Sequence, residues 1–258
     1  MQQVKSKHPA GTVCLGTAMT PRFYEFEDSL GNLKVPEGTI FNRRRSCDVA
    51  YNLNRAVDDM QGEWIFVLGD DHSFSPDLLL HLLDLSVDVV VPISPCKTYP
   101  FLPCVMHAPD DGSVWSDDMP IYNWGELSGT GLLALPKGDF IGQAGMLIRK
   151  NVIDAIPKPT FKTGKCHPGR LHEDLWFCHE IQELGFTVWV DQDTIFDHWF
   201  ALGITARRHE GKWVPALKSG AGTIVLPDAA NVETNYSAVE LPREPLQWQQ
   251  VNGEAKDA

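Results

Sequence analysis

The sequence predicts an α/β protein with a mostly parallel central sheet flanked by helices and a small antiparallel insertion. Short apolar runs alternate with helical patterns over the first hundred residues. Two of these runs, 63–69 and 87–93, are nearly continuous in apolar residues, which is typical of strands buried on both faces of a sheet. From 95 to 137 the chain is rich in proline, glycine and aromatic residues, which indicates an insertion.

The first strand is expected at 13–18, where a short apolar run precedes a polar, aromatic loop at 20–29. A helix is expected over 46–60, with Ser46 or Cys47 near its start. Its apolar residues recur at helical spacing and lie on one stripe. They are Val49, Leu53, Ala56, Val57 and Met60.

The next three elements follow each other closely. The run 63–69 is too short for a helix between its polar flanks and therefore predicts a strand. The Ser-Pro-Asp sequence at 75–77 is a typical helix start, because serine caps, proline fits the first helical position and aspartate opposes the helix dipole. A leucine-rich helix over 78–85 and a strand at 87–93 should follow.

The insertion carries two short runs, at 104–107 and 132–135, that predict antiparallel strands. After about residue 220 the chain loses periodicity, so we interpret 222–258 as a partly disordered appendage. Between them, the predicted elements are strands at 141–149, 186–190 and 194–198 and a helix at 173–184 that Gly185 ends.

Charge and cysteine usage narrow the classes of partner. The 258 residues include 22 Lys and Arg against 34 Asp and Glu, a net charge of −12, which argues against nucleic acid and anionic membranes as partners. The longest apolar runs fall short of the roughly 18 residues that a membrane span needs, and no signal peptide is expected. Six cysteines without a CxxC pair indicate neither a disulfide scaffold nor a zinc ribbon, so a cytoplasmic location is expected.

The sequence Gly69-Asp70-Asp71-His72 joins the buried strand at 63–69 to the following helix. Open α/β sheets bind ligands at the carboxyl ends of their strands, so these carboxylates would lie at the functional edge. Oxygen ligands there could hold Mg²⁺ or Mn²⁺, which would neutralise the diphosphate of a nucleotide. The alternative is a turn in which aspartate bonds locally.

Two further polar groups are candidates for chemistry. Glu173 and Asp174 open the helix at 173–184, where they either stabilise the helix dipole or act as a general base in a partly dry cleft. Asp197 and His198 end the last predicted strand, ahead of two aromatic residues. His198 is either a core side chain or a ligand that joins carboxylates around Mn²⁺.

A strand ending in GDDH, a later helix with HEDLWF at its start and a strand ending in DHW resemble, in this order, the motifs of GT-A glycosyltransferases. The chain is similar to their family 2-like branch, common in bacteria and bacteriophages, over residues 12–200. The resemblance implies a Rossmann-like GT-A fold in which Asp71 and His198 bind Mn²⁺ or Mg²⁺ with help from Asp70. It also implies that Asp174, the second carboxylate of the ED pair, is the catalytic base if the transfer inverts the anomeric centre. If the transfer retains it, Asp174 positions the acceptor.

The resemblance leaves the register of the acidic motif open. Gly69 stands where the family pattern DDD has its first acid, so Asp70 would take over a ribose or metal-water contact. In the alternative register of the DxD motif, His72 is the last member and a metal ligand. The catalytic pair is Asp174 with Glu173 beside it in either register.

Weaker family counterparts lie elsewhere in the chain. One group would cradle the nucleotide base, and a second lies before and on the first helix. A pair of arginines could close over the diphosphate. Gly145 and Trp124 are assigned to the acceptor side, where close packing is an equal explanation. The positions assigned to the nucleotide sugar are Thr17, Ala18, Met19, Arg45, Asn52, Asp70, Arg207 and Arg208.

The resemblance implies one catalytic domain over 1–221, with a nucleotide-binding half at about 12–94, an acceptor half at about 95–221 and an appendage at 222–258. The expected activity is metal-dependent transfer of a hexosyl group from a nucleoside diphosphate sugar, with UDP favoured, to a hydroxyl on a glycan or protein. A noncatalytic scaffold that binds nucleotide or glycan is one alternative. A sugar-phosphate nucleotidyltransferase is disfavoured, because 20–28 lacks the glycine-rich loop those enzymes share.

Overall fold

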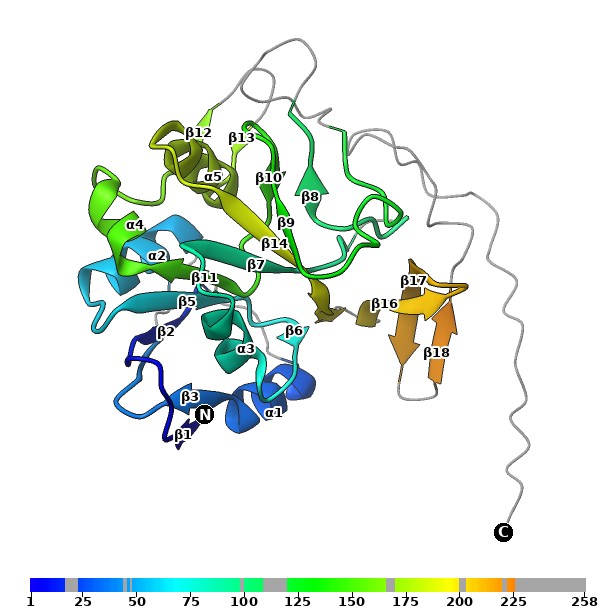
Figure 1. The fold of residues 1–258 in the computed structure, drawn as a ribbon, viewed down its shortest axis with the longest axis horizontal. Coiled ribbons are helices and arrows are strands. Elements are labelled where there is room, and N and C mark those ends of the chain that lie inside the picture. Colours follow the sequence, from blue (N-terminus) through cyan, green and yellow to red (C-terminus); the bar gives the residue numbers. More distant parts are fainter. Residues whose placement is uncertain are drawn as a thin grey trace.

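A computed structural model describes residues 1–16, 23–43, 46, 48–97, 100–108, 120–165, 170–199, 203–219 and 222–225. Its main feature is a seven-stranded central sheet (Figure 1). In spatial order its strands are β4 (Ile40–Arg43), β2 (Thr12–Leu15), β5 (Trp64–Leu68), β11 (Met146–Arg149), β7 (Val89–Ile93), β14 (Val188–Ile195) and β9 (Leu132–Ala134). β11 and β9 run antiparallel to the other five, so the expected α/β class with a mostly parallel sheet is confirmed.

Helices cover both faces of this sheet. Val13 and Leu15 of β2 pack with helices α1 (Tyr24–Asn32) and α3 (Leu78–Asp84) on one face. Cys14 points to the other face, because successive strand residues alternate, and packs with α2. The helices of that second face are α2 (Val49–Asp58), α4 (Lys150–Ala155) and α5 (Glu173–Glu183). The sheet is therefore the middle of three layers, buried on both sides.

The segment 20–29, predicted as a loop, is helical from Tyr24 onward, so that prediction was wrong for its second half. Phe26 and Leu30 lie four residues apart, on one side of α1, and both are buried against the sheet. Only these two apolar residues make the contact, which is why the helical pattern of apolar residues is weak in this part of the sequence. Two acidic residues in its first turn, Glu25 and Glu27, also favour the helix.

The predicted N-caps of two helices were one to two residues early. The N-cap of α2 is Asp48, whose carboxylate accepts from Tyr51 N at 2.9 Å, in place of Ser46 or Cys47. Helix α3 begins after Asp77, and Ser75 accepts from the backbone N–H of that residue at 3.2 Å. The strand expected at 141–149 is two strands, with β10 (Phe140–Ile141) separated from β11 by a short turn.

The two predicted insertion strands exist but belong to different sheets. β8 (Val105–Met106) pairs antiparallel with β10, whereas β9 pairs antiparallel with β14 and forms an edge of the central sheet. Two small pairs complete this part of the fold. They join β1 (Gln2–Val4) with β3 (Lys34–Pro36), and β12 (Gly164–Lys165) with β13 (Arg170–Leu171).

A second sheet of five strands stands beside the central sheet, at the end reached by β14 (Figure 1). Its strands are β6 (His72–Ser73), β15 (Asp197–Trp199), β16 (Gly203–His209), β17 (Lys212–Ser219) and β18 (Gly222–Val225). β18 lies within the predicted appendage, so that segment contributes one strand to this sheet. In the described part of the chain, every helix is too short or too polar to span a membrane.

Candidate metal centre and cavity

A cavity of about 360 Å³ lies at the carboxyl end of β5, which is within the size range of ligand sites. Its walls include Asp71 and His72 from the strand end, Glu173 and Asp174 from the start of α5, and His198 from β15. The three motifs singled out in the sequence therefore meet in one cavity, although about 100 residues separate the first from the second.

Asp71, His72 and His198 bring their ligand atoms within 4.8 Å of one another, and no other such group of three occurs among the described residues. Asp71 Oδ1 lies 2.8 Å from His72 Nδ1, and Asp71 Oδ2 lies 3.5 Å from His198 Nε2. The two imidazole rings stack with their centroids 4.0 Å apart. A carboxylate and two imidazoles are a donor set that suits a divalent metal ion.

Hydrogen bonds on the outer side of both rings orient them. His198 Nδ1 donates to the carbonyl oxygen of Pro95 at 2.7 Å, and its Nε2 faces Asp71. His72 Nε2 lies 2.9 Å from Ser94 Oγ, and that hydroxyl lies 3.5 Å from Pro95 O, to which it donates. Outer contacts of this kind commonly orient metal-binding histidines.

His72 Nδ1 is buried and makes no hydrogen bond in the structure, although it lies 2.8 Å from Asp71 Oδ1. A divalent ion held by both atoms would satisfy this buried nitrogen. Burial lowers the pKa of His72 to about 4, so the ring is neutral near pH 7. Burial would raise the pKa of Asp71, but its polar contacts with His198 and His72 outweigh burial and hold that pKa well below its usual range. The residues present therefore fit a metal ion.

Gly69 keeps the front of this group open. A Cβ at Gly69 would lie 2.8 Å from His72 Nδ1 and 3.1 Å from Asp71 Oδ1. A side chain there would occupy the space that the two ligand atoms face. Glycine at this place thus leaves room for an ion.

Lys97 brings a positive charge to the same carboxylate. Its ammonium donates to Asp71 Oδ2, the oxygen that faces His198. Asp70, the third predicted ligand, is buried and lines the cavity, but it does not belong to the group of three. An ion bound by the group would have to displace the lysine from Asp71.

Asp174 lies on the same cavity with the properties of a general base. Burial, followed by the neighbouring charge of Glu173, raises the pKa of Asp174 to about 6. Its Oδ1 accepts from Leu175 N at 2.8 Å, which orients the carboxylate. A carboxylate with a pKa near the working pH can both take up and release a proton.

Gln143 fixes the other carboxylate of the pair. Its Nε2 donates to Glu173 Oε1 at 3.0 Å, and its Oε1 is buried with no hydrogen-bond partner in the structure. Gln143 belongs to the turn between β10 and β11, which lines the cavity. The unpartnered amide oxygen is therefore an acceptor available to a hydroxyl group in the cavity.

The structure gives the two predicted acceptor residues packing roles. Trp124 is completely buried, and its Nε1 donates to Phe101 O at 3.1 Å. Gly145 has a φ of +73°, and a Cβ there would lie 2.4 Å from a ring carbon of Phe196. Packing thus accounts for both residues, and neither lines the described cavity.

The remaining predicted donor contacts lie away from the cavity or outside the described residues. Asn52 is buried in α2 and donates to Ser46 O at 3.1 Å. Arg207 donates to Thr205 Oγ1 at 2.9 Å, and the guanidinium of Arg208 lies 4.6 Å from the ring centroid of Trp213. Thr17, Ala18, Met19 and Arg45 lie outside the described residues.

Sequence reasoning gave no role to Ser94, Pro95 and Lys97, which support the metal group from the segment after β7. No local pattern marks these three residues. Their positions depend on a return of the chain, in which Cys104 N donates to Ser94 O at 2.7 Å. His72 was only an alternative ligand in the sequence. Its place in the group follows from its position opposite His198.

No protein-family model and no curated protein sequence matches the chain. Among solved structures, the protein A197 from STIV is similar, with a TM-score of 0.49 and 12% sequence identity over 75% of this chain and 89% of that one. The inositol-1-phosphate CTP transferase from T. maritima is also similar, with a TM-score of 0.40 and 12% identity over 73% of this chain and 88% of that one. Because both TM-scores are below 0.5, the function proposed below rests on the residues of this chain.

Proposed function

We propose that this protein is a metal-dependent glycosyltransferase. It would transfer a sugar from a nucleoside diphosphate sugar, with UDP as the favoured nucleotide, to a hydroxyl group of a glycan or protein. The observation that carries the proposal is that a metal-ligand group and a candidate base line the same cavity. The first is a donor set for a divalent ion, and the second is a carboxylate whose pKa is raised to about 6.

Asp71, His72 and His198 would hold the ion, and the two imidazoles favour Mn²⁺ over Mg²⁺. The ion would supply positive charge for the diphosphate that leaves. Lys97, once displaced from Asp71, would keep a second positive charge at the entrance of the same site. Both features favour departure of an anionic leaving group.

The transfer itself exchanges one bond for another at the anomeric carbon. The bond from that carbon to the diphosphate oxygen breaks, and a bond to the acceptor oxygen forms through a state with oxocarbenium character. Asp174 would take the proton of the acceptor hydroxyl as its oxygen attacks. Gln143 Oε1 would accept a hydrogen bond from a sugar hydroxyl and so orient one of the substrates. The products are the glycosylated acceptor and the nucleoside diphosphate.

Calorimetry with UDP tests the donor site directly. We expect UDP to bind in the presence of Mn²⁺ and to bind much more weakly without it. Asp71→Ala should lose the metal-dependent part of the binding. Asp193→Asn is the matched control, because the Asp193 carboxylate accepts from Gly131 N at 2.9 Å and takes no part in the metal group.

Release of UDP from UDP-sugars then separates an enzyme from a scaffold. Turnover that Asp174→Asn abolishes supports the transferase, whereas tight UDP binding without any turnover across donors and acceptors favours a noncatalytic binding protein. If neither UDP nor any other nucleotide binds with or without Mn²⁺, the proposal is wrong.

A further inference from the structure

The two histidines of the metal group lie opposite each other on a very short pair of strands. β6 pairs antiparallel with β15, so that His72 lies opposite His198 and Ser73 lies opposite Asp197. β6 has only two residues, and a pair of this length has few backbone hydrogen bonds to hold its register. Side-chain contacts across the pair therefore matter more here than in a long strand.

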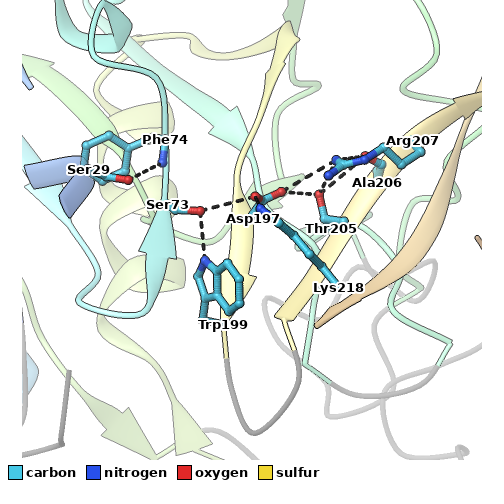
Figure 2. A network of polar contacts seen from close by, with 9 residues as sticks. All are labelled: Ser29, Ser73, Phe74, Asp197, Trp199, Thr205, Ala206, Arg207 and Lys218. Atoms are coloured by element: carbon cyan, nitrogen blue, oxygen red, sulfur yellow. Dashed lines mark hydrogen bonds and ion pairs between the residues drawn. The ribbon is translucent and has the colours of Figure 1, made fainter. Parts of the chain in front are cut away.

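Asp197 makes those contacts (Figure 2). Its Oδ2 accepts from Ser73 Oγ at 3.3 Å, across the strand pair, and from Lys218 Nζ of β17 at 2.8 Å. Its Oδ1 accepts from Thr205 Oγ1 of β16. One carboxylate thus joins the four strands β6, β15, β16 and β17.

The same network reaches the third residue of the metal group. Trp199 Nε1 donates to Ser73 Oγ at 2.8 Å, as Figure 2 shows, and Trp199 N donates to Asp71 O at 2.7 Å. The ammonium of Lys218 lies 5.1 Å from the ring centroid of Trp199. Asp197 therefore lies on the strand that carries His198 and contacts the strand that carries His72. It reaches the turn that carries Asp71 through Ser73 and Trp199.

Asp197 acts from the side of the strand pair away from the cavity. Successive residues of a strand point to opposite faces, and Asp197 is absent from the described cavity walls although its neighbour His198 is present. Its side chain is 18% exposed, and its charge is matched by Lys218 and by Arg207, whose Nη1 lies 3.7 Å from Oδ1. Loss of this carboxylate would leave two partly buried cations without their anion.

We propose that Asp197 is a positioning residue for the metal centre. It holds β6 and β15 in register, and so sets His72 and His198 at the spacing that one ion requires. The inference rests on the proposed metal site and adds that the second sheet, through β16 and β17, is part of that site. Outer partners of metal ligands commonly change metal affinity 10- to 100-fold.

The test measures Mn²⁺ affinity by calorimetry on the full chain, with no nucleotide present. Asp197→Asn should weaken the affinity at least ten-fold, whereas Asp193→Asn should leave it within two-fold of wild type. Ser73→Ala and Thr205→Val each delete one contact and keep the carboxylate, so they remain informative if Asp197→Asn does not fold. Each should weaken Mn²⁺ binding by about three-fold while the thermal midpoint stays close to wild type.

Imidazole ¹⁵N spectra of the metal-free protein give an independent measurement. In wild type, each ring should show a single tautomer, with a proton on His198 Nδ1. Ser73→Ala and Thr205→Val should mix the two tautomers, because the rings lose their fixed position. A structural contribution to stability alone would lower the thermal midpoint without changing these spectra.

The outcomes separate this inference from the proposed function. If wild type binds Mn²⁺ and the Ser73, Thr205 and Asp197 variants bind it equally well, Asp197 has no positioning role, although the metal site stands. If wild type binds no Mn²⁺, the proposed metal site and this inference both fail, because no metal centre remains to be positioned. Where wild type binds Mn²⁺, unchanged ring tautomers in the variants would overturn the inference, and mixed tautomers would support it.

Discussion

The strongest quantitative prediction concerns Asp174→Asn, which should stabilise the fold while it abolishes transfer. The pKa of Asp174 is raised from 3.8 to about 6, first by burial and then by Glu173. A shift of about two units corresponds to a free-energy difference of about 3 kcal/mol between the ionised and the protonated native protein. Asparagine has nearly the same shape without the charge, and its Oδ1 can keep the contact with Leu175 N.

The sign of the effect depends on pH. The unfolded chain loses the Asp174 proton near pH 4 and the native protein near pH 6, so this group contributes stability below pH 4 that is lost as pH rises through 6. Asp174→Asn should therefore unfold at the same temperature as wild type near pH 4. At pH 8 its thermal midpoint should be higher by about 8 °C, because about 3 kcal/mol shifts the midpoint of a chain of this size by roughly 2–4 °C per kcal/mol.

Thermal unfolding at pH 4 and pH 8 measures the gain in stability, and turnover at pH 8 measures the loss of activity. Glu183→Gln is the control at the other end of α5, because the Glu183 carboxylate is exposed and pairs with Lys137 at 3.0 Å. It should give no gain in midpoint. Transfer by Asp174→Asn should fall by about 100-fold or more. A variant that gains no stability at pH 8, or that gains equally at both pH values, would refute the electrostatic reasoning.

Three further predictions concern the metal group and its base. Lys97→Met should tighten Mn²⁺ binding several-fold in calorimetry, because the ammonium at Asp71 competes with the ion; weaker binding would contradict that competition. Gly69→Ala should weaken Mn²⁺ binding at least ten-fold, because its Cβ would lie 2.8 Å from His72 Nδ1; an unchanged affinity would place the ion elsewhere. The transfer rate at saturating donor should fall about ten-fold per pH unit below about pH 6, because Asp174 takes up its proton there. A rate that is constant from pH 5 to 7 would exclude Asp174 as the base.

Much of the fold is local enough to be predicted from the sequence. The runs 63–69 and 87–93 are apolar at nearly every position because both faces of the central sheet are covered, and β5 and β7 form there. The loop prediction at 20–29 failed because α1 owes its stability to two buried side chains, Phe26 and Leu30, and not to a long stripe. A helix with so short an apolar face depends on its tertiary contacts.

Candidate chemistry was also visible in the sequence, but the partners of each group were not. Acidic residues at a strand end and at a helix start are recognisable, and the raised pKa of Asp174 follows only from the burial and the neighbour that the fold supplies. Trp124 shows the opposite case. An aromatic residue in a loop-rich segment could contact a substrate, yet it is completely buried in the core.

Local sequence was enough to place β5, α3 and β7, the acidic end of β5 and the carboxylates at the start of α5, because these depend on neighbours a few residues away. The tertiary structure decided that His72 lies opposite His198, that Lys97 reaches Asp71 and that Asp197 joins four strands. These contacts link positions that are far apart in the chain, up to 126 residues for His72 and His198. Strand register over such separations depends on the packing of the whole sheet, which no local pattern encodes.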